Sequence, residues 1–267
     1  MPAARLRAFA PGRWVLLGLV LLLAVLLVAA IFAPASWADR ALDRASLGRV
    51  RLADAQGTIW HGQGRLVIVD AVGEGDPGPV LQGFTLPGAI DWRLSVLPLM
   101  LGIVDAQVSV GAMAEPVRIG GHPAEVRIGA GRLDLPAVSL SQLGSPWNTI
   151  QPSAALSLQW NALTLRDGIL DGRVSVELRE VASAMTPVRP LGTYRIDVDG
   201  TGQDVSLGLR TLSGPLKLEG NGAWERRAGL KFTASASAEG AERNRLQSLL
   251  ALIGQRDGDR TIIRIGG

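Results

Sequence analysis

Alternation of apolar and polar residues recurs along most of this 267-residue chain and constrains its fold more than any other feature. In AIDWRLSV the residues at 90, 92, 94 and 96 are apolar, and those between them are polar. A period of two is typical of a strand with one buried and one solvated face. The pattern returns in IVDAQVSV, ILDGRVSVEL, TYRIDVD, DVSLGL and LKFTASASA, and the closing TIIRI predicts a last strand. We predict a mainly β protein whose sheet is largely antiparallel, with one apolar face.

Turn residues separate these segments. Asp-Gly pairs at 167–168, 199–200 and 257–258, with Gly/Pro clusters at 73–79, 120–123 and 144–146, predict the turns between strands. In LSLQWNALTL the apolar residues change parity between Ala162 and Leu163, which predicts a β-bulge there.

One amphipathic helix is predicted in ERNRLQSLLALIG, which ends at Gly254. Its apolar side chains recur at i, i+3, i+4 and i+7, as Leu246, Leu249, Leu250 and Ile253. One such helix cannot cover a sheet of about a dozen strands. We therefore expect a curved or folded-over sheet with this helix at one end; a closed β-sandwich is the alternative. Any remaining apolar face must be covered by a partner or by lipid.

An unbroken apolar segment from Trp14 to Ala33 has about the 20 residues needed to cross a bilayer. Its N-terminal flank carries three Arg and no acid, which predicts a cytoplasmic tail at 1–13. We expect an anchor at 14–34, a linker or short helix at 35–48, and a β-rich domain beyond the membrane at 49–267. The anchor residues are Trp14, Leu16, Leu19, Leu22, Val25 and Phe32. A cleaved signal peptide with SWA at 36–38 is the alternative, but the apolar segment exceeds the usual h-region.

Few residues suit catalysis or metal binding. The chain has no Cys, and its two His, His61 and His122, have no metal-ligand spacing. Gly73–Gly78 matches GxGxxG, but PVLQGFTLPG follows it where a phosphate-binding helix would begin, so we interpret it as a turn. No GxSxG motif occurs, although a Ser-His-Asp triad assembled across the fold stays open. We predict no enzymatic activity, no metal and no cofactor, and the mild net charge of +3 argues against nucleic acid.

The motif GTIWHG places Trp60 and His61 between Gly57 and Gly62. His61 has no companion in sequence, whereas a Trp is large enough to anchor a sheet face. Glycine permits positive φ and close backbone approach, so we interpret the motif as the structural entry to the strand RLVIVD. If the apolar face forms a groove, its candidate lining includes this Trp together with Trp92, Trp160 and Trp224; core packing is the alternative.

The order of these motifs resembles that of the type II secretion system protein N family, also called general secretion pathway protein N. The shared features are the N-terminal span, GTIWHG, WRLSVLPLMLG at 92–102, LQWNALTL, LGTY at 191–194, SGPL at 213–216, GNGAW at 220–224 and the closing LLALIGQRDGDRTIIRIGG. The resemblance implies an accessory, non-catalytic component of the bacterial inner membrane with its main domain in the periplasm. Its implied partners are other type II secretion subunits.

The same resemblance extends distantly to AsmA-like proteins, whose curved β-sheets carry an apolar groove and are linked to lipid transport. That likeness implies the alternative function, a lipid-binding or lipid-transfer groove of the cell envelope. The apolar face of the sheet can be covered by the protein's own fold, by a partner or by lipid, so the sequence alone leaves both functions open.

Overall fold

The computed structural model describes residues 11–46, 48, 50–69, 83–86, 88–111, 113–122, 124–139, 147–167, 169–202, 204–225 and 229–266. The predicted turn at 73–79 and the Gly/Pro cluster at 144–146 lie outside these residues.

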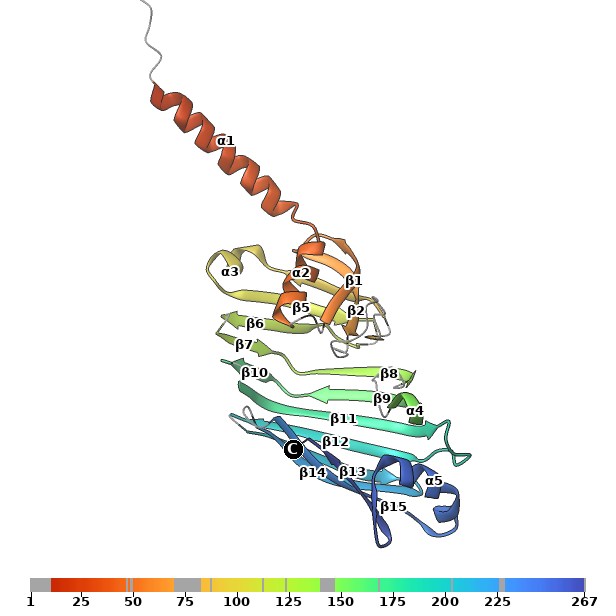
Figure 1. Cartoon of the computed structure of the whole chain (residues 1–267). Helices are drawn as coiled ribbons and strands as arrows, with labels where there is room; N and C mark the ends of the chain where they lie inside the picture. Colours follow the sequence, from red (N-terminus) through yellow and green to blue (C-terminus); the bar gives the residue numbers. More distant parts are fainter. Residues whose placement is uncertain are drawn as a thin grey trace, which may run out of the picture.

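Among the described residues, two helices come first and most of the rest are strands (Figure 1). The first part contains α1 (Pro11–Ile31), α2 (Ser36–Ala45), β1 (Val50–Gly57), β2 (His61–Val69), β3 (Gly83–Thr85), β4 (Ile90–Leu94), α3 (Val96–Met100), β5 (Val104–Val110), β6 (Val117–His122), β7 (Glu125–Ile128) and β8 (Gly131–Ser139). The second contains α4 (Trp147–Ile150), β9 (Pro152–Trp160), β10 (Leu163–Arg166), β11 (Ile169–Ser183), β12 (Gly192–Thr201), β13 (Asp204–Ser213), β14 (Leu216–Glu225), β15 (Gly229–Ala238), α5 (Arg243–Ile253), β16 (Gln255–Asp257) and β17 (Arg260–Ile265).

All these strands belong to one antiparallel sheet. Its pairings run β1–β2–β4–β5–β6–β7–β10–β11 and then β12–β13–β14–β15–β17–β16. β3 pairs with β2, while β8 and β9 pair with each other and β9 with β11. Figure 1 shows a long twisted ribbon of strands leading away from α1. The prediction of a mainly antiparallel β fold is confirmed, and the sheet is open.

The predicted bulge is also confirmed. β9 ends at Trp160 and β10 begins at Leu163, and both pair with β11. Trp160 pairs with Val174, and Thr164 pairs with Asp171. The segment from β9 to β10 therefore advances four residues where β11 advances only three. One extra residue therefore lies where the apolar parity of the sequence changes.

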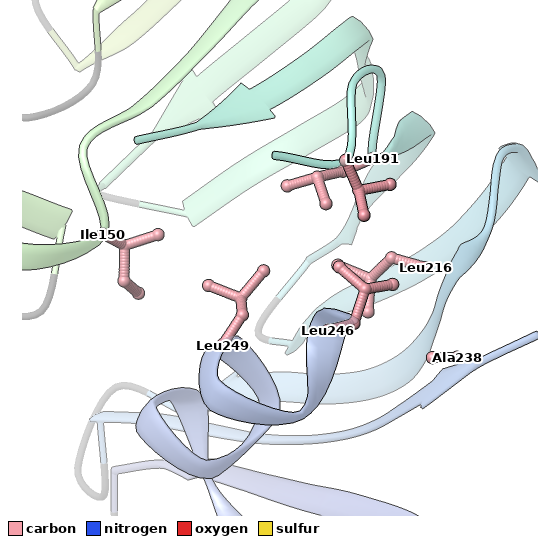
Figure 2. Close-up of a cluster of buried hydrophobic side chains, with 7 residues drawn as sticks. Ile150, Leu191, Leu216, Ala238, Leu246 and Leu249 are labelled. Carbon is pink, nitrogen blue, oxygen red and sulfur yellow. The ribbon is translucent and has the colours of Figure 1, made fainter. Parts of the chain in front are cut away.

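Helix α5 packs its apolar stripe on one end of the sheet, as its periodicity predicts. Leu246 and Leu249 are buried, in a cluster that includes Ile150, Leu191 and Leu216 (Figure 2). Figure 2 shows Leu246 beside Leu216, and Leu249 pointing from α5 toward the space between Ile150 and Leu191. Full burial of a Leu side chain stabilises a fold by about 1.5–3 kcal/mol, so these two residues fix the helix to the sheet.

Two local predictions are wrong. Val96 continues the alternation of β4, but the strand ends at Leu94 and Val96 begins α3. The Asp-Gly pair at 199–200 is no turn, because β12 continues to Thr201. A Cβ on Gly200 would lie 2.4 Å from the carbonyl oxygen of Leu170, so glycine is needed there for close strand approach.

The predicted anchor at 14–34 coincides largely with α1, and the predicted linker or short helix at 35–48 contains α2. Leu19, Leu22, Val25 and Phe32 are exposed, and the side chains of Trp14 and Leu16 lie outside the described residues. Counting only residues that the structure describes, no helix is both long and apolar enough to cross a membrane. The membrane anchor therefore stays a prediction.

Candidate interaction surfaces

The apolar side chains of the central strands lie on one face of the sheet. Cross-strand pairing places Val176 opposite Ile196, and Ile196 opposite Leu209. The set that we call the apolar face is Val174, Val176, Ile196, Val198, Leu207, Leu209 and Phe232. All seven side chains are partly exposed. The buried cluster beneath α5 occupies one end of the sheet instead, at Leu216 and Ala238. The apolar face is consequently the main candidate for contact with another molecule.

The opposite face carries cross-strand ion pairs. Glu125 accepts hydrogen bonds from Arg127 and Arg166, and these bonds hold the pKa of its carboxyl below the usual range. The Asp134 carboxylate accepts two hydrogen bonds from Arg132. These bonds, together with one from Ser157, lower the pKa of Asp134 to about 2. Further pairs join Arg195 to Glu177, Arg210 to Asp197 and Arg173 to Asp199. Exposed pairs contribute at most about 1 kcal/mol each, but opposite charges across strands favour this register and keep the face solvated.

Helix α2 occupies the free edge of β1. The Leu52 N–H donates to the Asp39 carboxylate at 2.8 Å, and the Val50 N–H donates to the Ser46 hydroxyl at 2.9 Å. Burial alone would raise the pKa of Asp39. The hydrogen bonds from the Leu52 N–H and from Arg51, with the charge of Arg51, outweigh burial, so the pKa is below its usual value. The edge at β16 is short and its three residues are exposed. Blocked or short edges discourage strand addition at these two ends of the sheet.

The motif GTIWHG forms the connection between β1 and β2. Gly57 has φ +92°, and the Thr58 N–H donates to the His61 carbonyl at 2.9 Å. A Cβ on Gly62 would lie 2.6 Å from Cζ2 of Trp92, so the second glycine makes room for the indole. Gly57 thus provides the backbone geometry of the turn, and Gly62 allows the close packing of Trp92.

His61 is exposed and lines an open recess of about 640 Å³ on the polar face of β2, β4 and β5. Gln63, Asp91, Arg93 and Ser109 also line it. Within the described ranges, no three His, Cys, Asp or Glu residues are grouped as a metal site would require. Nor is a hydrogen bond from the His61 imidazole to a hydroxyl or carboxylate present among those residues, so the recess shows no nucleophile–base pair.

Three candidate tryptophans donate their indole N–H to backbone carbonyls far along the sequence. Trp60 donates to Ala30 at 2.8 Å, Trp92 to Ile59 at 3.1 Å and Trp160 to Gly129 at 2.9 Å. Trp160 also packs on the buried cluster of β4, β5 and β8, while Trp224 is 39% exposed on β14. The register places Trp160 opposite Val174 and Trp224 opposite Val205, on the same side of the sheet as the apolar face. Whether these side chains line a groove stays a prediction. Sequence reasoning missed the indole bonds, because no local pattern signals a partner 30 residues away.

Residues 48–263 match the type II secretion system protein N family, a range from just before β1 to within β17. The chain belongs to that family. No curated protein and no solved structure matches it. Membership of the protein N family associates this chain with type II secretion and with the other subunits of that system. These comparisons give no support to the AsmA-like resemblance.

Proposed function

We propose that this protein is an accessory subunit of the type II secretion system that acts by protein contact in the periplasm. The observation that carries the proposal is the family match, which spans nearly the whole sheet. The open sheet with its partly exposed apolar face supports a binding role. The proposal includes a non-catalytic role, which is what the resemblance of the sequence to this family implies.

In this proposal α1 anchors the protein in the inner membrane. The sequence of α1 is PGRWVLLGLVLLLAVLLVAAI, with its only charged residue, Arg13, near the N-terminus. Arg5 and Arg7 precede it, so the positive-inside rule assigns the N-terminus to the cytoplasm and the sheet to the periplasm. The open sheet is then tethered on the side of the membrane where folded substrates await export.

The apolar face supports a protein partner in particular. Its residues are aliphatic or aromatic, and the charged side chains of the same strands belong to the opposite face, where many form ion pairs. Protein interfaces are depleted in charge at their centres and polar at their rims. A partner surface that covers Ile196 and Leu209 would meet this arrangement.

A lipid-handling role is the second candidate, and one observation favours it. The apolar face extends from Val174 on β11 across the neighbouring strands to Phe232 on β15, and its side chains are partly exposed. Acyl chains could cover such a surface as a partner protein does.

Deletion of the gene, with plasmid complementation, separates the two functions. Folded exoproteins are quantified in the periplasm and the supernatant, and outer-membrane leakage is scored with a dye. Retention of exoproteins in the periplasm, with an intact outer membrane, is the result expected for the secretion role. Normal export combined with a leaky envelope would overturn that role and favour lipid handling.

A further inference from the structure

The turn between β4 and β5 exposes a continuous group of apolar side chains. We call residues 96–103, which contain α3, the α3 loop. Leu97, Met100 and Leu101 have exposed fractions of 77%, 78% and 78%, and the other large apolar residues there, Val96, Leu99 and Ile103, are exposed as well. A contiguous exposed patch of this kind indicates an interaction site.

The backbone of the α3 loop satisfies much of its hydrogen bonding internally. The N–H groups of Leu101 and Ile103 both donate to the Pro98 carbonyl at 2.9 Å, and Gly102 donates to Leu99 at 3.0 Å. At its base, the Ser95 N–H donates to the Asp105 carbonyl at 2.8 Å. Backbone entering hydrocarbon must be hydrogen-bonded within the protein, and the α3 loop meets much of that demand.

Two hydrogen bonds connect the loop to the end of α1. The Trp60 indole donates to the Ala30 carbonyl at 2.8 Å, and the Leu94 N–H donates to the Trp60 carbonyl at 2.6 Å. Leu94 lies two residues before Val96, where α3 begins. Figure 1 shows α3 projecting from the end of the sheet at which α1 leaves it. The exposed loop therefore lies beside the predicted exit of the chain from the membrane.

The charged and aromatic residues around the α3 loop are also consistent with contact with a membrane surface. Residues 96–103 include no charged side chain, whereas Arg93 is exposed three residues before α3. Phe32 and Trp37, between α1 and the first turn of α2, are also exposed. Apolar residues flanked by aromatic and cationic ones are typical of segments that enter a bilayer interface.

We propose that the α3 loop inserts into the periplasmic leaflet of the bilayer that α1 crosses, as a second membrane contact. The inference rests on the proposed anchor. Two attachment points, α1 and the α3 loop, fix the orientation of the sheet relative to the membrane, whereas α1 alone would leave the sheet free to turn and tilt together with α1 in the bilayer.

The absence of cysteine from the chain permits a direct test with single-cysteine variants. Met100→Cys in the full-length protein is labelled with NBD and reconstituted into vesicles of phosphatidylethanolamine and phosphatidylglycerol. Quenching is measured with doxyl-labelled lipid and with aqueous iodide. Met185→Cys, at a site 45% exposed on the loop between β11 and β12, is the control for a water-facing probe. Leu22→Cys reports on α1.

Insertion predicts a blue-shifted emission at Met100→Cys that doxyl lipid quenches and iodide does not, with the reverse at Met185→Cys. Iodide quenching at Met100→Cys, with lipid quenching at Leu22→Cys, would overturn the insertion while leaving the anchor intact; the loop would then face a protein partner. Iodide quenching at both sites would overturn the anchor and, with it, this inference. Neither outcome bears on export, which the deletion strain tests separately.

Discussion

The indole N–H of Trp60 donates to the backbone carbonyl of Ala30 at 2.8 Å and so joins the β1–β2 turn to the last turn of α1. Two backbone bonds strengthen this junction, from Ile59 to Ala33 at 2.9 Å and from Ala35 to Gly57 at 3.1 Å. The sheet thus meets α1 through a defined contact, which positions the α3 loop and the apolar face relative to the helix.

Trp60→Phe tests this junction, since it keeps an aromatic ring and removes the donor. A lost hydrogen bond costs about 0.5–1.5 kcal/mol. We expect faster amide hydrogen exchange at residues 30–35 and 57–60, with unchanged exchange in β11–β14. Equal protection of the junction in the variant and the wild type would show that the indole bond contributes nothing to it.

Gly131 packs against the ring of Trp160, where a Cβ would lie 2.4 Å from Cζ2 and 2.8 Å from Cγ2 of Val117. Gly131→Ala is expected to displace the indole and lower the free energy of unfolding by about 1–3 kcal/mol. Urea unfolding in detergent, with near-UV circular dichroism, measures both effects. Gly208→Ala is the matched control, because its Cβ would meet no atom within 4 Å. Equal stability of the two variants would refute the packing account.

The α5 cluster gives a second stability test. Leu246→Ala removes a buried side chain beneath α5 and is expected to cost about 2–5 kcal/mol of unfolding free energy. Leu252→Ala, on the same helix but 42% exposed, should change it by less than about 0.5 kcal/mol. Similar denaturation midpoints for the two would mean that α5 does not hold this end of the sheet together.

Asp134 predicts a pH dependence. Its pKa is lowered from 3.8 to about 2 by Arg132 and Ser157, so its contribution is present above about pH 4 and is lost as the pH falls toward 2. Because the pair is exposed, the contribution is below about 1 kcal/mol. Asp134→Asn should be slightly less stable than the wild type at pH 7, and the difference should shrink between pH 4 and pH 2. If the variant is still less stable than the wild type at pH 2, the difference arises from packing and not from the charge of Asp134.

The sequence predicts most strands because period-two alternation is a direct record of a sheet with one solvated face. Prediction from the sequence fails where residues far apart in the chain determine the local backbone conformation. Gly200 looks like a turn residue beside Asp199, but it is required by the approach of Leu170. Val96 continues an apolar parity and yet begins a helix, and that is why the α3 loop was missed. The Trp60–Ala30 bond joins a turn to a helix, and no local pattern encodes it.

The central claim is that the apolar face supports export. Its most direct test complements the deletion strain with Leu209→Asn or with Leu212→Asn, two substitutions on β13 that differ in exposure. Leu209 belongs to the apolar face, whereas Leu212 is 45% exposed and outside it. At equal protein levels, Leu209→Asn should trap exoproteins in the periplasm while Leu212→Asn restores export to the supernatant. Full export with Leu209→Asn would contradict the account.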